Sequence, residues 1–238
     1  MSMRPARSSA ELTPQLAVVA WLAAFVLGNS AAAIIVGFTD YQGLDVDQFP
    51  LWLIAANFAA LWVGLLLALV GVSHYTGSGS FKKDYGAVVR ARDALVGIPV
   101  GVVVQLVFLP LMYKGLDRFF DTSDLEEPAR DLTKSASGLG VVLLVLVVAV
   151  GAPIVEELFY RGMVLRAFKA RVNDSLSIVI TAVLFALVHF QALQLPGLIL
   201  FGLVAGYLAN RYGRLGPAIF AHVGFNGAAV ALLLAERW

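Results

Sequence analysis

Six stretches of at least 20 residues contain no Asp, Glu, Lys or Arg, and one of them, 175–210, is long enough for two spans; these stretches constrain the fold more than any other feature. A helix needs about 20 residues to cross the hydrocarbon core, where no water satisfies exposed backbone groups. The sequence therefore predicts an all-α, polytopic transmembrane helical bundle of about seven spans, the sixth of them short for a full crossing. The expected spans are Gln15–Phe38, Pro50–Val72, Ala94–Tyr113, Gly138–Val155 and onward, Leu176–Leu193, Pro196–Asn210 and Gly216–Ala235.

Composition agrees with extensive lipid contact. Hydrophobic residues make up 60% of the 238 residues and charged residues 14%, whereas about half of a soluble domain is apolar. The net charge of +1 predicts no strong attraction to nucleic acid. Because the chain has no cysteine, disulfides, thiolate catalysis and thiolate metal ligation are excluded.

The distribution of basic residues predicts the orientation in the membrane. Short cytoplasmic loops are enriched in Lys and Arg. With the N-terminus inside, the cytoplasmic segments carry 12 basic residues and the external segments five. The cytoplasmic segments are 1–14, 73–93, 156–175 and 211–214, and the external ones are 39–49, 114–137 and 236–238. We therefore expect a multi-pass protein of the cell membrane whose N-terminus is inside and whose C-terminus is outside.

Ionisable residues interrupt the fourth apolar run at Glu156, Glu157 and Arg161. Such residues are costly inside a membrane and suggest function. Helical spacing places Glu157 and Arg161 on one face, while Glu156 lies about 100° away around the axis. One interpretation is that Arg161 neutralises Glu157 and leaves Glu156 as a carboxylate in an apolar cleft. The alternative is an interfacial ion pair where the helix leaves the membrane.

Polar residues also occur in the fifth and seventh runs. Phe185 and His189 are four residues apart, and so are His222 and Asn226, so each pair shares a helix face. Together with the two glutamates, His189, His222 and Asn226 are candidate catalytic groups, and Phe185 is a supporting residue. The alternative is that they form hydrogen bonds between membrane helices and only hold the bundle together.

Distances along the helices predict that the polar residues meet at one depth. Glu156 and His189 each lie about 16 residues, or 24 Å of helix, from the turn at 172–175. His222 and its partner in the last span lie about 12–18 Å from the turn at 211–216. The inferred site is therefore about a third of the way into the bilayer from the cytoplasm. This depth leaves 191–197 in the outer leaflet as a broken corner that protein must shelter.

Together the three motifs, EExxxR, FxxxH and HxxxN, resemble the CPBP family, which groups type II CAAX prenyl endopeptidases with Abi-type bacteriocin-processing and immunity proteins. The resemblance covers about Gly138–Ala235, and no motif position departs from the pattern. Residues 1–135 are expected to form N-terminal transmembrane helices without a motif. Residues 136–238 are expected to form the peptidase core.

The resemblance implies an intramembrane peptidase whose site opens toward the cytoplasm. It implies that Glu156 and His189 activate water as general base and positioning partner. It implies that His222 and Asn226 polarise the scissile carbonyl or stabilise the oxyanion. The substrate would be a membrane-associated or lipidated peptide.

The resemblance also implies that Glu157 and Arg161 support the substrate or the first motif helix. It leaves the metal open, because both a metalloprotease and a metal-free glutamate mechanism are argued for the family. Glu156, His189 and His222 form a plausible Zn²⁺ set, but the helical zinc-protease signature HExxH is absent.

Two other functions fit the sequence less fully. A transporter would also bury ionisable residues, but usually at several depths or in inverted repeats. A non-catalytic immunity or scaffold protein of the same family would keep the fold without the reaction. Loss of Glu156 or His189 would indicate it, and both are present.

Overall fold

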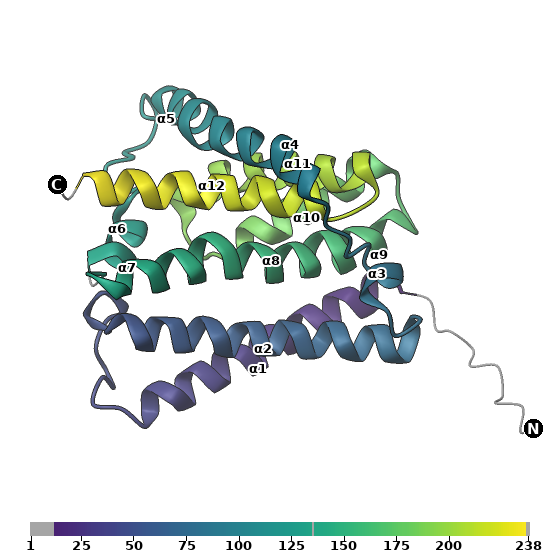
Figure 1. The fold of residues 1–238 in the computed structure, drawn as a ribbon, viewed down its shortest axis with the longest axis horizontal. Helices are drawn as coiled ribbons and strands as arrows, with labels where there is room; N and C mark the ends of the chain where they lie inside the picture. Colours follow the sequence, from purple (N-terminus) through teal and green to yellow (C-terminus); the bar gives the residue numbers. More distant parts are fainter. Residues whose placement is uncertain (1–11, 135, 237–238) are drawn as a thin grey trace, which may run out of the picture.

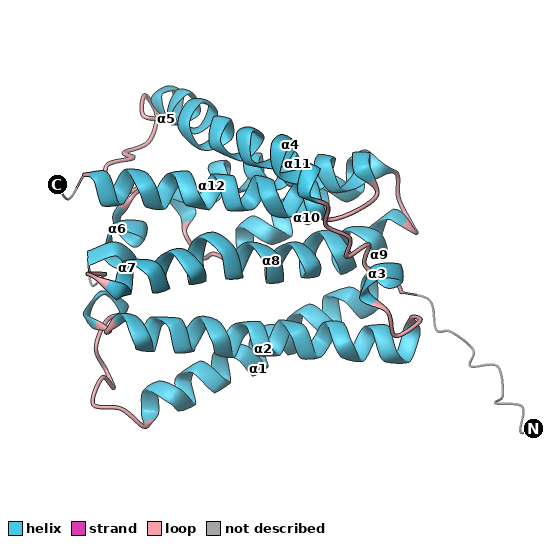
Figure 2. Cartoon of the chain, in the orientation of Figure 1, coloured by secondary structure: helices cyan, strands magenta, loops and turns pink. Residues whose placement is uncertain are grey.

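The protein is a bundle of long helices, as a computed structural model shows for residues 12–134 and 136–236 (Figures 1 and 2). No β-strand occurs within these described residues. Six helices are long and apolar enough to cross a membrane, and a seventh apolar helix is shorter. The predicted all-α transmembrane fold is confirmed. Arg4 and Arg7, which contribute to the predicted orientation, lie outside the described residues.

An N-terminal hairpin consists of α1 (Pro14–Gly37) and α2 (Leu51–Thr76), separated by a loop with the short 3₁₀ helix η1 (Val46–Gln48). Thr13 caps α1, since its hydroxyl accepts a hydrogen bond from Leu16 N. The two helices cross closely at Gly64, where an added Cβ would lie 2.6 Å from the Ala24 carbonyl oxygen. Small residues at such crossings are typical of packed membrane helices.

The third span begins after the short α3 (Phe81–Asp84). It consists of α4 (Ala91–Val103), one π-helical turn η2 (Val104–Phe108) and α5 (Leu109–Leu116). The loop that follows contains α6 (Glu127–Lys134), which lies at the end of the bundle near the C-terminus (Figure 1).

The fourth span is one continuous helical segment, Leu139–Lys169, that carries the EExxxR motif. It consists of α7 (Leu139–Leu144), α8 (Ala152–Glu157) and α9 (Leu165–Lys169), joined by the π-helical turns η3 (Val145–Gly151) and η4 (Leu158–Val164). The two glutamates therefore lie on the short α-helical piece between two π-turns.

The fifth apolar run forms a short helix rather than a full span. After its N-cap Asn173, α10 (Asp174–Leu187) is 14 residues long and ends before His189. The 3₁₀ helix η5 (Ala192–Gln194) and α11 (Leu195–Tyr212) follow. Counted from Ala192 to Tyr212, the sixth run is long enough to span, so the short helix is the fifth and not the sixth.

The predicted broken corner between α10 and α11 is present. Phe190 adopts a positive φ of 52°, which is uncommon for a bulky residue. The Tyr113 hydroxyl donates to the Leu193 carbonyl at 2.8 Å and accepts from Gly197 N at 3.2 Å. Gln194 Nε2 donates to the Leu125 carbonyl. These contacts give the exposed backbone of the corner the partners that a membrane does not supply.

The last helix, α12 (Gly216–Ala235), packs most extensively against α4. Glycine makes this approach possible, because a Cβ at Gly101 would meet the Ala221 carbonyl oxygen at 1.8 Å and one at Gly224 the Ile98 carbonyl oxygen at 2.5 Å. Gly224 therefore serves helix packing, whereas a Cβ at Gly227 would meet nothing.

The basic segments gather at one end of the bundle. Gly86 and Val88 carbonyls accept from Leu215 N and Gly216 N, and Arg214 binds the buried Asp93 at 2.5 Å. This end also carries the turn between α9 and α10. The opposite end carries α6, the start of α7 and the C-terminal end of α12 (Figure 1).

Candidate functional site

A buried ion pair lies at the centre of the site. Arg161 Nη1 donates to Glu157 Oε1 at 2.9 Å, and both side chains are completely buried. Arg161 Nη2 donates to the Gly202 carbonyl of α11 at 3.1 Å, and the guanidinium lies 4.6 Å from the centre of the Phe185 ring. The predicted pairing of these two residues is confirmed, and its interfacial alternative does not fit the burial.

His222 shares the same carboxylate. Its Nδ1 lies 2.9 Å from Glu157 Oε1, and only 3% of the residue is exposed. Because ionised Glu157 can only accept, the Nδ1 proton is donated to it and Nε2 is directed elsewhere. Phe201 and Phe185 pack against the imidazole with ring centroids 4.6 and 5.7 Å away. The ring is thus fixed by one carboxylate and two aromatic neighbours.

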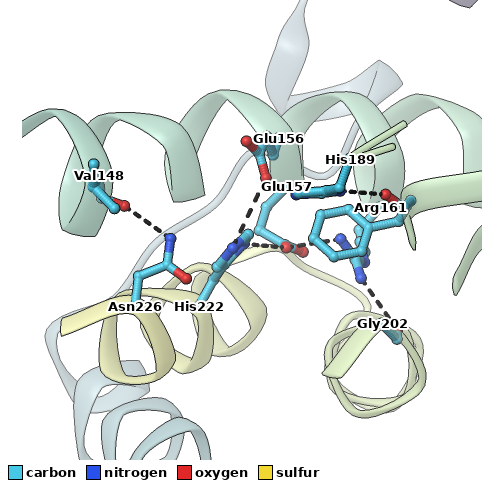
Figure 3. Close-up of polar contacts among 9 residues, drawn as sticks. Val148, Glu156, Glu157, Arg161, His189, Gly202, His222 and Asn226 are labelled. Carbon is cyan, nitrogen blue, oxygen red and sulfur yellow. Dashed lines mark hydrogen bonds and ion pairs between the residues drawn. The ribbon is translucent and has the colours of Figure 1, made fainter. Parts of the chain in front are cut away.

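Glu156 lies one residue from the ion pair but faces an open space. Its Oε2 is 3.8 Å from His222 Nε2, which is too long for a direct hydrogen bond (Figure 3). The side chain is 17% exposed and lines a cavity of about 530 Å³. The predicted carboxylate in an apolar cleft is therefore Glu156.

His189 lies just beyond the end of α10 and lines the same cavity. Its Nδ1 is 2.8 Å from the Phe185 carbonyl oxygen, and the two rings are 4.9 Å apart. Because a carbonyl only accepts, Nδ1 carries the proton here and Nε2 is the unprotonated nitrogen of the neutral ring. The FxxxH motif thus fixes its histidine through both the backbone and the ring of Phe185.

Asn226 completes the set of predicted residues. It lies one turn beyond His222 on α12, as its spacing predicts, and lines the cavity. One amide hydrogen is donated to the Val148 carbonyl at 2.8 Å (Figure 3). A primary amide has a second N–H donor, which remains for a substrate oxygen. Every predicted site residue is therefore in the cluster or, for Asn226, beside it.

Structural and catalytic zinc sites take at least three protein ligands around one point. Within residues 12–134 and 136–236, no three His, Asp or Glu side chains are arranged to hold a metal ion. The arrangement of Glu156, His189 and His222 thus does not fit a zinc site, and we derive no step through a metal.

The cavity extends from the cluster in one direction. Its walls include the parts of α5, α7 and α12 that approach the end carrying α6. The fourth span and α12 are tightly packed on the basic side of the cluster, where six residues are 0–7% exposed: Phe159, Tyr160, Met163, Leu215, Ala218 and Ile219. The resemblance implies a site that opens toward the cytoplasm, whereas this cavity leads away from the basic end.

Four neighbours of the site were not predicted. Trp21 of α1 donates from Nε1 to the buried Tyr160 hydroxyl at 3.1 Å, and the Tyr160 ring contacts Phe185. Tyr113 and Gly202 bind the site from α5 and α11. Tyr160 stands inside the first motif, which could have marked it. Trp21 and Gly202 carry no signal in a single sequence, because only the tertiary fold brings them here.

One comparison with known proteins identifies a family. The family model described as type II CAAX prenyl endopeptidase Rce1-like matches residues 138–228. This range contains all three motifs and the helices from α7 to most of α12. No curated protein and no solved structure is significantly similar to the chain.

Proposed function

Through residues 138–228 the chain belongs to the CPBP family, as an Rce1-like type II CAAX prenyl endopeptidase homologue, and we propose that it is an intramembrane endopeptidase. It is a multi-pass membrane protein of a protease family. We propose further that it hydrolyses a peptide bond with water activated by Glu156 and His189, at a depth nearer the cytoplasmic face. Its substrate would be a membrane-associated or lipidated peptide.

The main support for the proposal is that two adjacent glutamates have different surroundings and so can have different roles. Glu157 is fully buried and bound to Arg161 and His222, so it has no free access to substrate. Glu156 instead lines the cavity and has no direct hydrogen bond to His222. One carboxylate therefore fixes the site, and the other is placed to accept a proton from water.

In the proposed reaction, Glu156 removes one proton from water as the water oxygen attacks the scissile carbonyl carbon. His189, fixed by its Nδ1 bond to Phe185, orients that water through Nε2. When the tetrahedral intermediate collapses, the C–N bond breaks and Glu156 returns the proton to the leaving nitrogen. Asn226 donates its second N–H to the carbonyl oxygen.

We assign His222 to the scissile carbonyl together with Asn226. Glu157 holds its Nδ1, which leaves Nε2 directed toward Glu156 and the cavity. From that position an Nε2 proton would polarise the substrate carbonyl.

The decisive experiment is proteolysis of a membrane-peptide library by the purified protein and by Glu156→Ala. The proposal expects cleavage by the wild type and none above background by the variant. Equal cleavage by both proteins would refute the role of Glu156. Absence of cleavage by the wild type on every peptide would favour the immunity or scaffold protein.

Zinc dependence is tested by dialysis against a chelator. The metal-free mechanism expects unchanged cleavage. Complete loss that zinc restores would instead assign ligation to Glu156, His189 and His222, and would require these side chains to move together when the metal binds.

A further inference from the structure

His189 lies in a turn, whereas the other catalytic candidates lie within helices. The helix before it, α10, ends at Leu187, and the residue after it, Phe190, adopts the positive φ of 52°. This backbone conformation is unfavourable for a bulky residue and persists only where surrounding contacts hold it. The neighbours of Phe190 therefore bear on the orientation of the His189 ring.

The N-terminal helix α1 supplies one of these neighbours. The ring centroids of Phe25 and Phe190 lie 5.7 Å apart, although 77% of Phe190 is exposed. No second aromatic ring contacts Phe190 in the part of the chain that the structure describes. Phe25 is stacked on Trp21, with ring centroids 6.2 Å apart, and the two residues share one face of α1 because they are four positions apart.

The same face of α1 is linked to His189 from the other direction, through Trp21. Trp21 Nε1 donates to the Tyr160 hydroxyl at 3.1 Å, and the Tyr160 ring meets the Phe185 ring edge to face at 5.3 Å. Phe185 in turn contacts His189 through its ring at 4.9 Å and through its carbonyl oxygen at 2.8 Å. Edge-to-face pairs have a preferred geometry, so each ring limits the orientation of the next.

We propose that Trp21 and Phe25 of α1 are positioning residues for His189. Trp21 acts through the rings of Tyr160 and Phe185, and Phe25 acts through Phe190. Together they keep the imidazole in the orientation in which Nδ1 binds the Phe185 carbonyl and Nε2 is free. The inference rests on the proposed role of His189 in orienting water, and it assigns a part in that step to a helix outside residues 138–228.

The tautomer of His189 reports whether its ring is held. The chain has three histidines, so isotope labelling of the histidine rings gives few signals in magnetic resonance, and His189→Gln identifies the signal of His189. Chemical shifts distinguish a protonated from an unprotonated ring nitrogen at a pH where histidine is neutral. We expect Nδ1 to be protonated in the wild type, because it binds a carbonyl oxygen.

Two variants remove the contact between α1 and the turn. Phe25→Ala removes the ring beside Phe190 and should let His189 exchange between its two neutral tautomers. Phe190→Gly should do the same, because Gly adopts the positive φ without strain but has no ring. The matched control is Phe38→Ala, which removes an 87% exposed ring at the end of α1 and should leave the tautomer fixed.

The outcomes that would overturn the proposal differ between the variants. A fixed tautomer in Phe25→Ala would show that α1 does not hold the ring. A fixed tautomer in Phe190→Gly would show that the turn alone orients His189. The His222 ring, which Glu157 holds, should keep its own tautomer in every variant. A change at both histidines would indicate general loosening of the bundle and would also overturn the proposal.

Cleavage is measured separately from the ring. If the protein is a peptidase, Phe25→Ala should lower kcat by about 10–10²-fold with little change in KM, because a misplaced group slows the reaction without removing a substrate contact. Phe38→Ala should keep the wild-type rate. A released His189 ring without cleavage by any form, the wild type included, would leave the positioning intact and refute only the proposed function. A full rate in Phe25→Ala would overturn the inference while leaving the peptidase in place.

Discussion

The N-terminal hairpin is more hydrophobic than the last two spans but less buried. Over an 18-residue stretch of each helix, α1 and α2 have mean hydropathies of 2.1 and 2.4, with 17% and 33% of the residues buried. The spans ending in α11 and α12 are less hydrophobic, at 1.8 each, yet 39% and 44% buried. The last two spans are thus less hydrophobic and more buried than the hairpin, as expected for helices surrounded by protein rather than by lipid.

This difference indicates where function can be found. The buried residues of α1 are only Ala17, Ala20, Ala24 and Gly28, which suit close helix contact and no chemistry. The motif segment and α12 instead bury Glu157, Arg161 and His222. The hairpin nevertheless reaches the site at one polar contact, from Trp21 to Tyr160. The predictions below ask how separate the two regions are.

The largest effect is expected at Glu156 in the core. Glu156→Gln keeps the shape of the side chain and removes its basicity, so cleavage should slow by about 10²–10⁴-fold with an unchanged melting temperature. His189→Ala should act on the same step, so the double variant should be little slower than either single variant. Single-turnover rates and thermal unfolding measure this. If the rate losses of the two single variants add in the double variant, the two residues act on different steps.

The next effect is expected on stability, at Glu157. Glu157→Gln leaves the buried Arg161 without its counter-charge, and breaking such a pair costs about 3–5 kcal/mol. Unfolding in mild detergent should show a lower midpoint together with lost activity. The matched control is Glu126→Gln, which breaks an exposed ion pair and should be nearly neutral. Equal midpoints for both variants would contradict the proposed importance of the buried pair.

A smaller effect is expected where the hairpin meets the core. Trp21→Phe removes the hydrogen bond to Tyr160, worth about 0.5–1.5 kcal/mol, and should lower both the melting temperature and the cleavage rate modestly. Trp52→Phe is the same substitution at an exposed position of α2 and should change neither. If the two variants behave alike, the hairpin does not support the site through Tyr160.

The smallest effect is expected at the connection between the regions. Burial alone would raise the pKa of Asp84, but hydrogen bonds from Ser73, Ser78 and Ser80 outweigh it and hold that pKa below its ordinary value. This contribution to stability is complete above the unfolded pKa of about 3.9 and is lost as the pH falls through the lower folded value. Asp84→Asn should therefore make the free energy of unfolding less dependent on pH, and only below about pH 4.

The change in pH dependence is measured from melting temperatures between acid and neutral pH. Asp121→Asn, in the external loop, is the comparison, because hydrogen bonds from Ser123 lower the pKa of that exposed carboxyl without joining two regions. An equal change in both variants would show that the turn around Asp84 does not couple the hairpin to the core.

The sequence predicted the site residues better than it predicted the length of α10, which ends just before His189. The Glu157–Arg161 pair follows from helical spacing, and equal helix lengths brought Glu156 and His189 to one cavity. The end of α10 did not follow, because no Gly or Pro marks it within the uncharged run. Phe190 turns the chain there in a left-handed conformation that bulky residues rarely adopt.

The pairing of His222 could not be predicted either. Spacing places it on the inner face of α12 but does not choose between two adjacent carboxylates. The choice of Glu157 depends on the close crossing of α4 and α12 and on the width of the motif helix between its π-turns. The backbone partners Gly202 and Val148 could not be predicted either, because every residue has a carbonyl oxygen and only the tertiary fold selects these two.

The two π-turns make the number of residues in the motif segment more critical than their identity. In a π-turn the helix holds one extra residue, and such bulges are frequent at functional sites. Deleting one residue from 145–151 would convert the wide turn to an α-helix, and the glutamates would stay on nearly the same face relative to α7, because the wide turn itself holds the extra residue. The deletion would move the Val148 carbonyl that Asn226 binds. This stretch, VLVVAVG, can therefore exchange one apolar side chain for another, whereas a single-codon deletion would disturb the hydrogen bond that holds Asn226.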